Sequence, residues 1–198
     1  MTRLLIASNN PDKISEIRVL LAGLDVQLLT LKDFPELPAT VEDRDTISGN
    51  AMKKALEAAQ NTALPCLADD TGLFIPALDM EPGVRAARFA GEHCSYKDNR
   101  DKVLRRMDTA RERQAEFKTC VALAAPDGII AIKEGVMPGA ITFQERGENG
   151  FGYDSIFEPE GSGKTYAEMT DAEKNRVSHR ARALHLMLPI LKEFISTQ

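Results

Sequence analysis

Apolar and polar positions follow two different patterns along this 198-residue chain. In the first part, short apolar runs at residues 3–7, 26–29 and 65–68 alternate with segments whose apolar residues repeat at helical spacing, at residues 14–24 and 49–60. This alternation predicts strands and helices in turn. The stretch 33–45 is rich in Pro, Glu and Asp and has no clear period, so we expect a loop or lid there.

The second part is richer in predicted strands. Runs at residues 117–125 and 129–136 flank the turn signal Pro126-Asp127-Gly128 and predict a hairpin. Pro138-Gly139 precedes another short run at 140–143, and a charged helix is expected over residues 96–113.

A last helix is expected to begin at the capping box formed by Thr170 and Glu173, with Pro189 kinking or ending it. Its buried face would carry Val177, Ala181, Leu184 and Leu188. Together the patterns predict an α/β protein with a mixed central sheet and flanking helices. They favour a single domain over residues 1–198, without an independent linker.

Composition narrows the function classes. Hydrophobic residues make up 43% and charged residues 28%, which is ordinary for a soluble enzyme. The net charge of −5 repels a nucleic-acid backbone, so no nucleic acid polymer is expected as a partner. Single nucleotides remain possible, because one local cationic pocket is enough to hold them.

The three cysteines form no CxxC pair, and Cys66 and Cys120 lie in apolar runs that predict burial. This pattern argues against a disulfide framework or a structural zinc site and favours a reducing compartment. The first apolar run is too short for a signal peptide, and no run reaches the length of a membrane span. We therefore expect a cytoplasmic protein with no membrane partner.

A first chemical segment joins the first strand to the first helix. Free backbone N–H groups and the helix dipole would favour a phosphate there, and Lys13 adds a point charge. The segment has no glycine, so it is neither a P-loop nor a GxGxxG loop. The alternative is that Asn10 or Ser8 merely caps the helix. The segment comprises Ser8, Asn9, Asn10, Pro11, Asp12 and Lys13.

A second segment, Asp69-Asp70-Thr71-Gly72, is expected at the end of the strand that begins at residue 65. Carboxylates at the carboxyl end of a strand commonly face a site, and Mg²⁺ needs only one or two of them besides substrate phosphates. Neighbours in an extended chain point in opposite directions. One of the two aspartates would therefore serve the metal or a water, and the other would be tied to the backbone or a cation. The alternative is an Asx turn.

A second source of carboxylates lies upstream, where Glu42, Asp43 and Asp45 fall in the irregular stretch. Simple solvent exposure is the alternative for these three residues.

A third segment combines Phe151-Gly152-Tyr153-Asp154 with the donor-rich run from Glu173 to Arg180. Such donors suit a polar, negatively charged small molecule, and a solvated helix start is the alternative. Lys174 and His179 are five positions apart, which on an ideal helix separates them by about 140°. They converge only if Lys174 precedes the helix or the ligand wraps around the helix start. We favour the first, which places the helix start after the capping box.

These segments resemble the inosine triphosphate pyrophosphatase family, also called Ham1-type or dITP/XTP pyrophosphatases. The resemblance runs nearly end to end. It is carried by Ala7-Ser8-Asn9-Asn10 with Lys13, Asn50-Ala51 with Lys54-Ala55, Ala68 to Leu73, Pro82-Gly83 with Ala87-Arg88-Phe89 and Gly91, Phe151 to Asp154, Lys164-Thr165 with Ala167-Glu168, and Glu173-Lys174 with Ser178-His179-Arg180.

The resemblance implies an elongated, two-lobed ITPase-like fold with an active-site cleft between the lobes. It also implies a cytosolic homodimer that hydrolyses non-canonical purine nucleoside triphosphates (ITP, dITP and XTP) to the monophosphate and pyrophosphate, using Mg²⁺. Such an enzyme removes these nucleotides from the nucleotide pool.

The resemblance also implies residue roles. Residues 8–13 would hold the phosphates, and Thr71 would lie beside the substrate. Asp70 would be the proton acceptor and a magnesium ligand, with Glu42 the best match for a second metal carboxylate. The substrate would further contact Phe151, Gly152, Tyr153, Asp154, Lys174, His179 and Arg180, of which Phe151 to Asp154 with His179 and Arg180 line the base pocket.

The sequence departs from the family at a few positions. Asp12 with Lys13 stands where the family often has Gly-Lys, and the loop lacks the usual glycine. Ser48-Gly49 stands where a Glu often precedes the Asn-Ala pair, so no metal role is carried over to that position. Thr71 replaces the usual Ser and keeps the hydroxyl.

The expected mechanism is attack of water on the α-phosphorus, with Asp70 as the base and Lys13 and Lys174 stabilising charge. His179 and Arg180 would donate to the 6-oxo group of hypoxanthine or xanthine, and adenine would leave them unpaired. Two alternatives remain open: a nucleotide pyrophosphatase of another specificity, such as the Maf-like enzymes, and a non-catalytic nucleotide-binding module.

Overall fold

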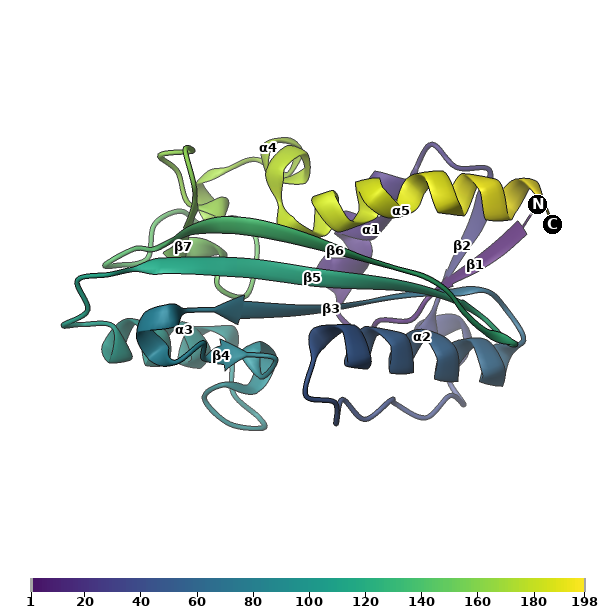
Figure 1. Ribbon diagram of the computed structural model, residues 1–198, viewed down its shortest axis with the longest axis horizontal. Helices are drawn as coiled ribbons and strands as arrows, with labels where there is room; N and C mark the ends of the chain where they lie inside the picture. Colours follow the sequence, from purple (N-terminus) through teal and green to yellow (C-terminus); the bar gives the residue numbers. More distant parts are fainter. Residues whose placement is uncertain (1, 198) are drawn as a thin grey trace. The chain divides into compact units, whose positions relative to one another are not determined.

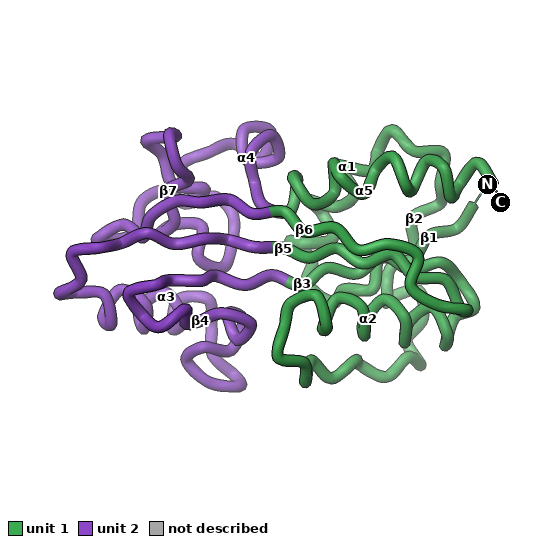
Figure 2. The backbone as a smooth tube through the Cα atoms, viewed as in Figure 1, with its two compact units in different colours: residues 1–70, 119–135, 180–198 green, residues 71–118, 136–179 purple. Residues whose placement is uncertain are grey.

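The computed structural model describes residues 2–197, so Met1 and Gln198, the ends of the predicted single domain, lie outside it. The chain forms two compact units, coloured separately in Figure 2. Unit 1 comprises residues 1–70, 119–135 and 180–198, and unit 2 comprises residues 71–118 and 136–179. Whether they constitute one domain stays a prediction.

The sheet of unit 1 has the strand order β2-β1-β3-β5-β6. The strands are β1 (Thr2–Ile6), β2 (Val26–Thr30), the first part of β3 (Cys66–Phe74), the end of β5 (Gln114–Ala125) and the start of β6 (Gly128–Ile141). β1 pairs in parallel with β2 and β3, and parallel neighbours need crossover connections. Helices α1 (Pro11–Leu21) and α2 (Ile47–Thr62) lie in these connections. The predicted turn at Pro126-Asp127 joins β5 to β6.

Helices cover both faces of this sheet. Figure 1 shows α1 and α5 (His179–Ser196) on one face and α2 on the other. The predicted apolar stripe of α1 is confirmed, because Ile14, Ile17 and Leu21 are buried. They pack in a core with residues of β1, β3, β5 and α5, among them Leu4 and Leu184.

Unit 2 contains the rest of β3, β5 and β6 together with smaller elements. These are β4 (Pro82–Gly83), α3 (Tyr96–Arg106), β7 (Phe157–Pro159) and α4 (Asp171–Val177), with short 3₁₀ helices at Pro76–Leu78, Ala86–Arg88, Asp154–Ile156 and Tyr166–Glu168. Another short 3₁₀ helix, Leu31–Asp33, lies in unit 1. β4 pairs antiparallel with β3, and β7 with β6. The core of unit 2 is built around Phe117, Phe157 and Tyr166. Parallel and antiparallel pairs therefore coexist, and the predicted mixed α/β class is confirmed.

The prediction that a strand ends at Asp69-Asp70 is wrong. β3 runs on through Thr71 and Gly72 to Phe74, where it pairs with β4. Gly72 is needed for this pairing, since a Cβ there would lie 2.8 Å from the carbonyl oxygen of Gly83. The glycine thus marks a close approach of two strands and not a turn. The two aspartates lie inside a strand, which excludes the Asx turn.

Two further boundaries were predicted wrongly. β6 continues through Pro138-Gly139, because the Pro138 carbonyl accepts the Glu160 N–H and Gly139 pairs with Pro159 of β7. α3 ends at Arg106 and not at Arg113.

The capping box of Thr170 and Glu173 is confirmed at the start of α4. The prediction that Lys174 lies in a loop before the helix is wrong, because Lys174 belongs to α4. The backbone turns extended at Ser178, and a separate helix, α5, starts at His179. Pro189 lies inside α5 and does not end it.

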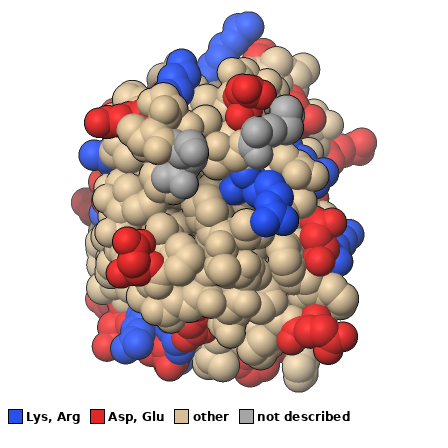
Figure 3. Space-filling view, turned by 90° about the vertical axis from the view of Figure 1, so that its right-hand side faces the viewer, with Lys and Arg blue, Asp and Glu red and all other residues tan. Residues whose placement is uncertain are grey.

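Among the described residues, the face of the molecule drawn in Figure 3 has no concentration of one charge, and two of the three cysteines are buried. The side of the molecule that Figure 3 shows carries scattered charges of both signs among uncharged residues. Cys66 and Cys120 are buried as predicted, and burial raises the pKa of each thiol to about 12. Within residues 2–197 no helix has both the length and the apolar character that crossing a membrane requires.

Arg113 of unit 2 provides a test of this fold. Its buried guanidinium donates to the backbone carbonyls of Met107, Ile141 and Thr142. Arg113→Met leaves these acceptors without their partner, so we expect the free energy of unfolding to fall by about 2–4 kcal/mol. Arg111→Met is the control, because Arg111 is exposed. Equal denaturant midpoints for the two variants would contradict the packing described for Arg113.

Candidate active site

Asp69 and Asp70 are adjacent buried carboxylates in the middle of β3. Because side chains alternate along a strand, they point to opposite faces. Asp69 contacts Lys13 of α1 and Arg180 of α5, whereas Asp70 contacts residues of α2. Figure 1 shows these helices on opposite faces of the unit 1 sheet. The predicted division of labour between the two aspartates therefore has a structural basis.

Asp69 is held between two cations. Its Oδ2 lies 3.1 Å from Lys13 Nζ and accepts hydrogen bonds of 3.1 Å from Nε and Nη2 of Arg180. Burial acts to raise the pKa of Asp69, but Lys13 and Arg180 outweigh it and keep that pKa well below its usual range. Nη1 of Arg180 donates to Glu16 of α1. Asp69 is thus the aspartate tied to nearby cations, and it joins α1, β3 and α5.

In the loop before α1, side chains accept hydrogen bonds from nearby backbone N–H groups. The Asn10 side chain accepts the N–H groups of Asp12 and Lys13, and Ser8 Oγ accepts the N–H of Asn10. The expectation of free N–H groups at this helix start is therefore wrong for Asp12 and Lys13, and the capping alternative is confirmed for Asn10. The attraction of this loop for an anion therefore depends on the positive charge of the Lys13 side chain and not on the N–H groups of Asp12 and Lys13. Burial lowers the pKa of Lys13, although Asp69 opposes the shift.

Asp70 is oriented by two residues of α2. Asn50 Nδ2 donates to its Oδ2 at 3.1 Å, and Lys54 Nζ lies 3.5 Å from its Oδ1. The same ammonium donates to Glu42 at 2.5 Å. Burial raises the pKa of Asp70 against the opposing charge of Lys54. Burial acts to lower the pKa of Lys54, yet Asp70 and Glu42 outweigh it and raise that pKa.

Glu42 and Asp70 therefore share one cation, the Lys54 ammonium. Their oxygens are the hard ligands that Mg²⁺ prefers, and Mg²⁺ completes its shell with waters and phosphates. Among residues 2–197 no group of three or more His, Cys, Asp and Glu side chains is arranged to hold a metal. Two carboxylates on a common cation fit Mg²⁺, which takes its remaining ligands from elsewhere. Glu42 is also more than a solvated surface charge, since its side chain is 29% exposed and paired.

Unit 2 has a second buried ion pair. Asp154 Oδ2 accepts the Lys174 ammonium at 2.6 Å and the backbone N–H of Phe151 at 2.8 Å, and both charged side chains are 5% exposed. Lys174 Nζ also lies 4.6 Å from the ring centroid of Phe151 and 5.6 Å from that of Tyr166. The segment Phe151 to Asp154 and α4 are thus brought together, as the sequence predicts.

Three other unit 2 residues of the predicted site have partners of their own. The His179 ring is buried and stacks on Phe117 at 4.4 Å between centroids. The Tyr153 hydroxyl donates to the Ala86 carbonyl, and the Gly152 carbonyl accepts Arg100. Because α4 ends before α5 begins, Lys174 and His179 do not share one helical face, which confirms that part of the prediction.

The predicted site residues thus fall into two groups. Unit 1 contains Ser8, Asn9, Asn10, Pro11, Asp12, Lys13, Glu42, Asp70 and Arg180. Unit 2 contains Thr71, Phe151, Gly152, Tyr153, Asp154, Lys174 and His179. Asp70 and Thr71 are neighbours in the chain, as are His179 and Arg180. The role of each residue toward a substrate stays a prediction.

The sequence predicts no role for Glu16, Asn50 or Lys54. Asn50 and Lys54 are four positions apart in α2, so they share one helical face with the buried Ala51 and Ala55. Two polar residues at this spacing among alanines are the sequence pattern that could have indicated a buried polar site on α2.

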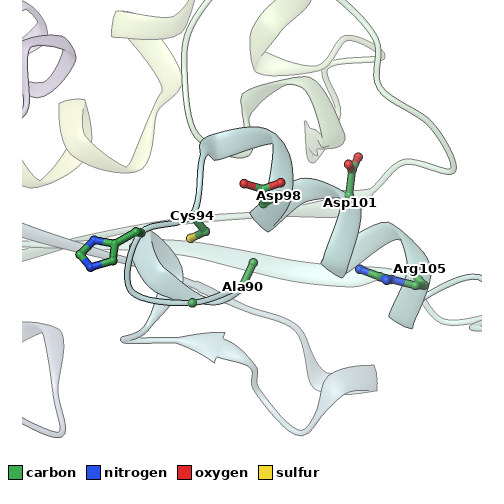
Figure 4. A pocket seen from close by; sticks show the side chains of 7 residues that line it. Ala90, Cys94, Asp98, Asp101 and Arg105 are labelled. Atoms are coloured by element: carbon green, nitrogen blue, oxygen red, sulfur yellow. The ribbon is translucent and has the colours of Figure 1, made fainter.

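A pocket of about 470 Å³ lies elsewhere in unit 2, beside α3. Figure 4 shows Cys94, Asp98, Asp101 and Arg105 around it. Its carboxylates are already engaged, since Asp98 caps α3 through Ser95 and Asp101 pairs with Lys97. It contains none of the predicted site residues.

Comparisons with known proteins identify relatives of the whole chain. A family model described as the Ham1 family matches residues 4–190. A protein from Elusimicrobium minutum named dITP/XTP pyrophosphatase is 45% identical over 187 residues, which cover 91% of this chain and 95% of that protein. A protein of the same name from Geobacter sulfurreducens is 45% identical over 189 residues, covering 94% and 95%.

A solved structure is also similar. The HAM1 protein from Coxiella burnetii has a TM-score of 0.89 and 37% sequence identity, over 98% of this chain and 100% of that one. The similarity supports the ITPase-like fold expected from the sequence.

The buried pair of unit 2 gives a stability test. Lys174→Met leaves the Asp154 carboxylate buried without its cation, so we expect the free energy of unfolding to fall by about 3–5 kcal/mol. Lys164→Met is the matched control, since Lys164 and its partner Glu173 are half exposed, and we expect a loss below about 1 kcal/mol. Chemical denaturation measures both. A Lys174→Met protein as stable as the control would show that Asp154 does not depend on this cation.

Proposed function

Since the chain belongs to the Ham1 family, we propose that it is a nucleoside-triphosphate pyrophosphatase that hydrolyses ITP, dITP and XTP to the monophosphate and pyrophosphate. Relatives that carry the name dITP/XTP pyrophosphatase support this substrate class. One observation within the chain carries the proposal. Asp70 is a buried carboxylate whose Oδ2 is held by Asn50 while its Oδ1 faces a cation shared with Glu42. We further propose a cytoplasmic homodimer that clears these nucleotides from the pool.

In the proposed reaction a water oxygen forms a bond to the α-phosphorus, and the bond from this phosphorus to the bridging oxygen breaks. Asp70 accepts the proton of the water, and pyrophosphate leaves with the bridging oxygen. Lys13 and Lys174 stabilise the negative charge that develops on the phosphates. The remaining residues of the loop 8–13 and Thr71 position the phosphates.

Glu42 and Asp70 would hold Mg²⁺. Bound there, Mg²⁺ would neutralise charge on the phosphate oxygens and so favour departure of pyrophosphate. The support for this assignment is the geometry of the two carboxylates around the Lys54 ammonium. Lys54 would then contribute a further positive charge beside the phosphates.

Discrimination among bases would depend on buried hydrogen-bond donors. Hypoxanthine and xanthine present a 6-oxo acceptor, whereas adenine presents a 6-amino donor. Adenine would leave unpaired the His179 donor and any Arg180 N–H that Asp69 and Glu16 do not accept, which costs much of the binding free energy. Phe151 to Asp154 would complete this pocket. The Asp69 and Glu16 carboxylates fix the orientation of the Arg180 guanidinium.

A panel of nucleotides tests the proposed function. We expect purified protein with Mg²⁺ to release pyrophosphate and the monophosphate in equal amounts from ITP, dITP and XTP, and little from ATP. Ion-exchange chromatography quantifies both products.

Each rival makes a different prediction for the same panel. Preferential hydrolysis of dTTP or UTP would favour a Maf-like specificity. Binding without pyrophosphate release would favour a non-catalytic module, and orthophosphate as the first product would exclude attack at the α-phosphorus.

The role of Asp70 is tested by Asp70→Asn, which keeps the shape of the side chain and removes the base. We expect kcat on XTP to fall by about 10²- to 10⁴-fold. Asp43→Asn is the control, because Asp43 is exposed and pairs with Lys53 near the same site. An Asp70→Asn enzyme with kcat near that of the control would exclude Asp70 as the proton acceptor.

A further inference from the structure

Asn50 is a polar residue at a position where α2 is otherwise apolar. It is 1% exposed, and its neighbours Ala51 and Ala55 are fully buried. A buried primary amide is costly unless both of its ends are hydrogen-bonded. Both ends of Asn50 are used: Nδ2 donates to Asp70 Oδ2 at 3.1 Å, and Oδ1 accepts the backbone N–H of Arg44 at 3.0 Å.

These two partners leave only one orientation for the amide. A carboxylate can only accept a hydrogen bond, and a backbone N–H can only donate one. An amide turned by 180° would place donor against donor and acceptor against acceptor. Asn50 is therefore matched to Asp70 on one side and to Arg44 on the other.

The link to Arg44 concerns the irregular segment 34–46, which carries Glu42. Figure 1 shows this segment running alongside α2. Lys53 of α2 also reaches it, through the Val41 carbonyl and Asp43, but that contact is exposed. At Gly49 a Cβ would lie only 2.9 Å from the Cβ of Arg44, so the segment packs tightly on the first turn of α2. The Asn50 bond is the buried anchor of this packing.

The link to Asp70 fixes the other carboxylate. With Oδ2 occupied by Asn50, Oδ1 is turned toward Lys54, which also contacts Glu42. One buried side chain thus anchors the backbone two residues after Glu42 and also orients Asp70. Contacts in the layer behind metal ligands hold the ligands in place, and their loss commonly weakens metal affinity by about 10- to 100-fold.

We propose that Asn50 is a positioning residue that holds the Glu42 and Asp70 carboxylates in register for one divalent cation. The proposal rests on the proposed function, in which these two carboxylates bind Mg²⁺. Asn50 itself touches neither metal nor substrate. It acts by joining the segment that carries Glu42 to the strand that carries Asp70.

The test compares Asn50 with Asn99, a second buried asparagine. Asn99 is 2% exposed and also uses both ends of its amide, donating to the Ala87 carbonyl and accepting the Ala90 N–H. It lies in α3 of unit 2, so its loss should disturb folding to a similar degree without touching either carboxylate. The variants are Asn50→Leu and Asn50→Ser, each paired with the same change at Asn99.

Two readouts need no catalysis. The first is the affinity for Mn²⁺ alone, measured from the resonance signal of free Mn²⁺ in titrations of each protein. The second is hydrogen exchange of the segment 41–46 by mass spectrometry, since Asn50 accepts the Arg44 N–H. We expect both Asn50 variants to lose Mn²⁺ affinity by about tenfold or more and to exchange faster in this segment. The Mg²⁺ concentration for half-maximal hydrolysis of XTP should rise by a similar factor.

The Asn99 variants should match wild type in Mn²⁺ affinity and in exchange of residues 41–46. If Asn50→Leu does not fold, Asn50→Ser carries the comparison. Folded Asn50 variants with wild-type Mn²⁺ affinity would overturn the proposal, as would an equal loss in the Asn99 variants. A failure of the proposed function would look different, since wild-type protein would then release no pyrophosphate, or Asp70→Asn would bind Mn²⁺ as well as wild type does.

Discussion

Two adjacent carboxylates buried in the middle of one strand impose the strongest physical constraint on unit 1. Neither Asp69 nor Asp70 can be buried in its charged form without a cation or donor close by. Because they face opposite sides of the sheet, the compensating groups must come from helices on both faces. α1 and α5 supply Lys13 and Arg180 to Asp69, and α2 supplies Asn50 and Lys54 to Asp70. The contacts that hold these helices against the sheet are therefore the same contacts that set the charge around the two carboxylates.

The surroundings of the two carboxylates differ in a way that separates their roles. The cations around Asp69 are buried with it and hold its pKa low, so it serves as a fixed anion that organises Lys13 and Arg180. Burial instead raises the pKa of Asp70, and Glu42 lies across the shared Lys54 ammonium from it. Unit 2 also buries a charged pair, Lys174 and Asp154, and there the Lys174 ammonium lies over the Phe151 and Tyr166 rings.

Much of the fold could be predicted from the sequence, because local patterns carry that information, and the sequence also drew attention to the two carboxylates that prove to be buried in β3. The stripe of α1, the hairpin turn at Pro126-Asp127 and the Thr170 capping box were all predicted correctly. Errors arose where a residue has more than one structural use. Gly72 was expected at the end of a strand, but it lies inside β3 and allows Gly83 to approach. No role could be predicted for Asn50 and Lys54, because only the fold shows that the segment 34–46 packs against α2 and that Glu42 contacts Lys54.

The proposed reaction depends on attack by a water molecule at the α-phosphorus of a purine nucleoside triphosphate. Hydrolysis of XTP in water enriched in the heavy isotope of oxygen tests it most directly, with mass spectrometry of both products from single turnovers. We expect the heavy oxygen only in the nucleoside monophosphate, because the bond to the α-phosphorus is the one that the water forms. Heavy oxygen in the pyrophosphate would place the attack at the β-phosphorus and exclude the proposed reaction.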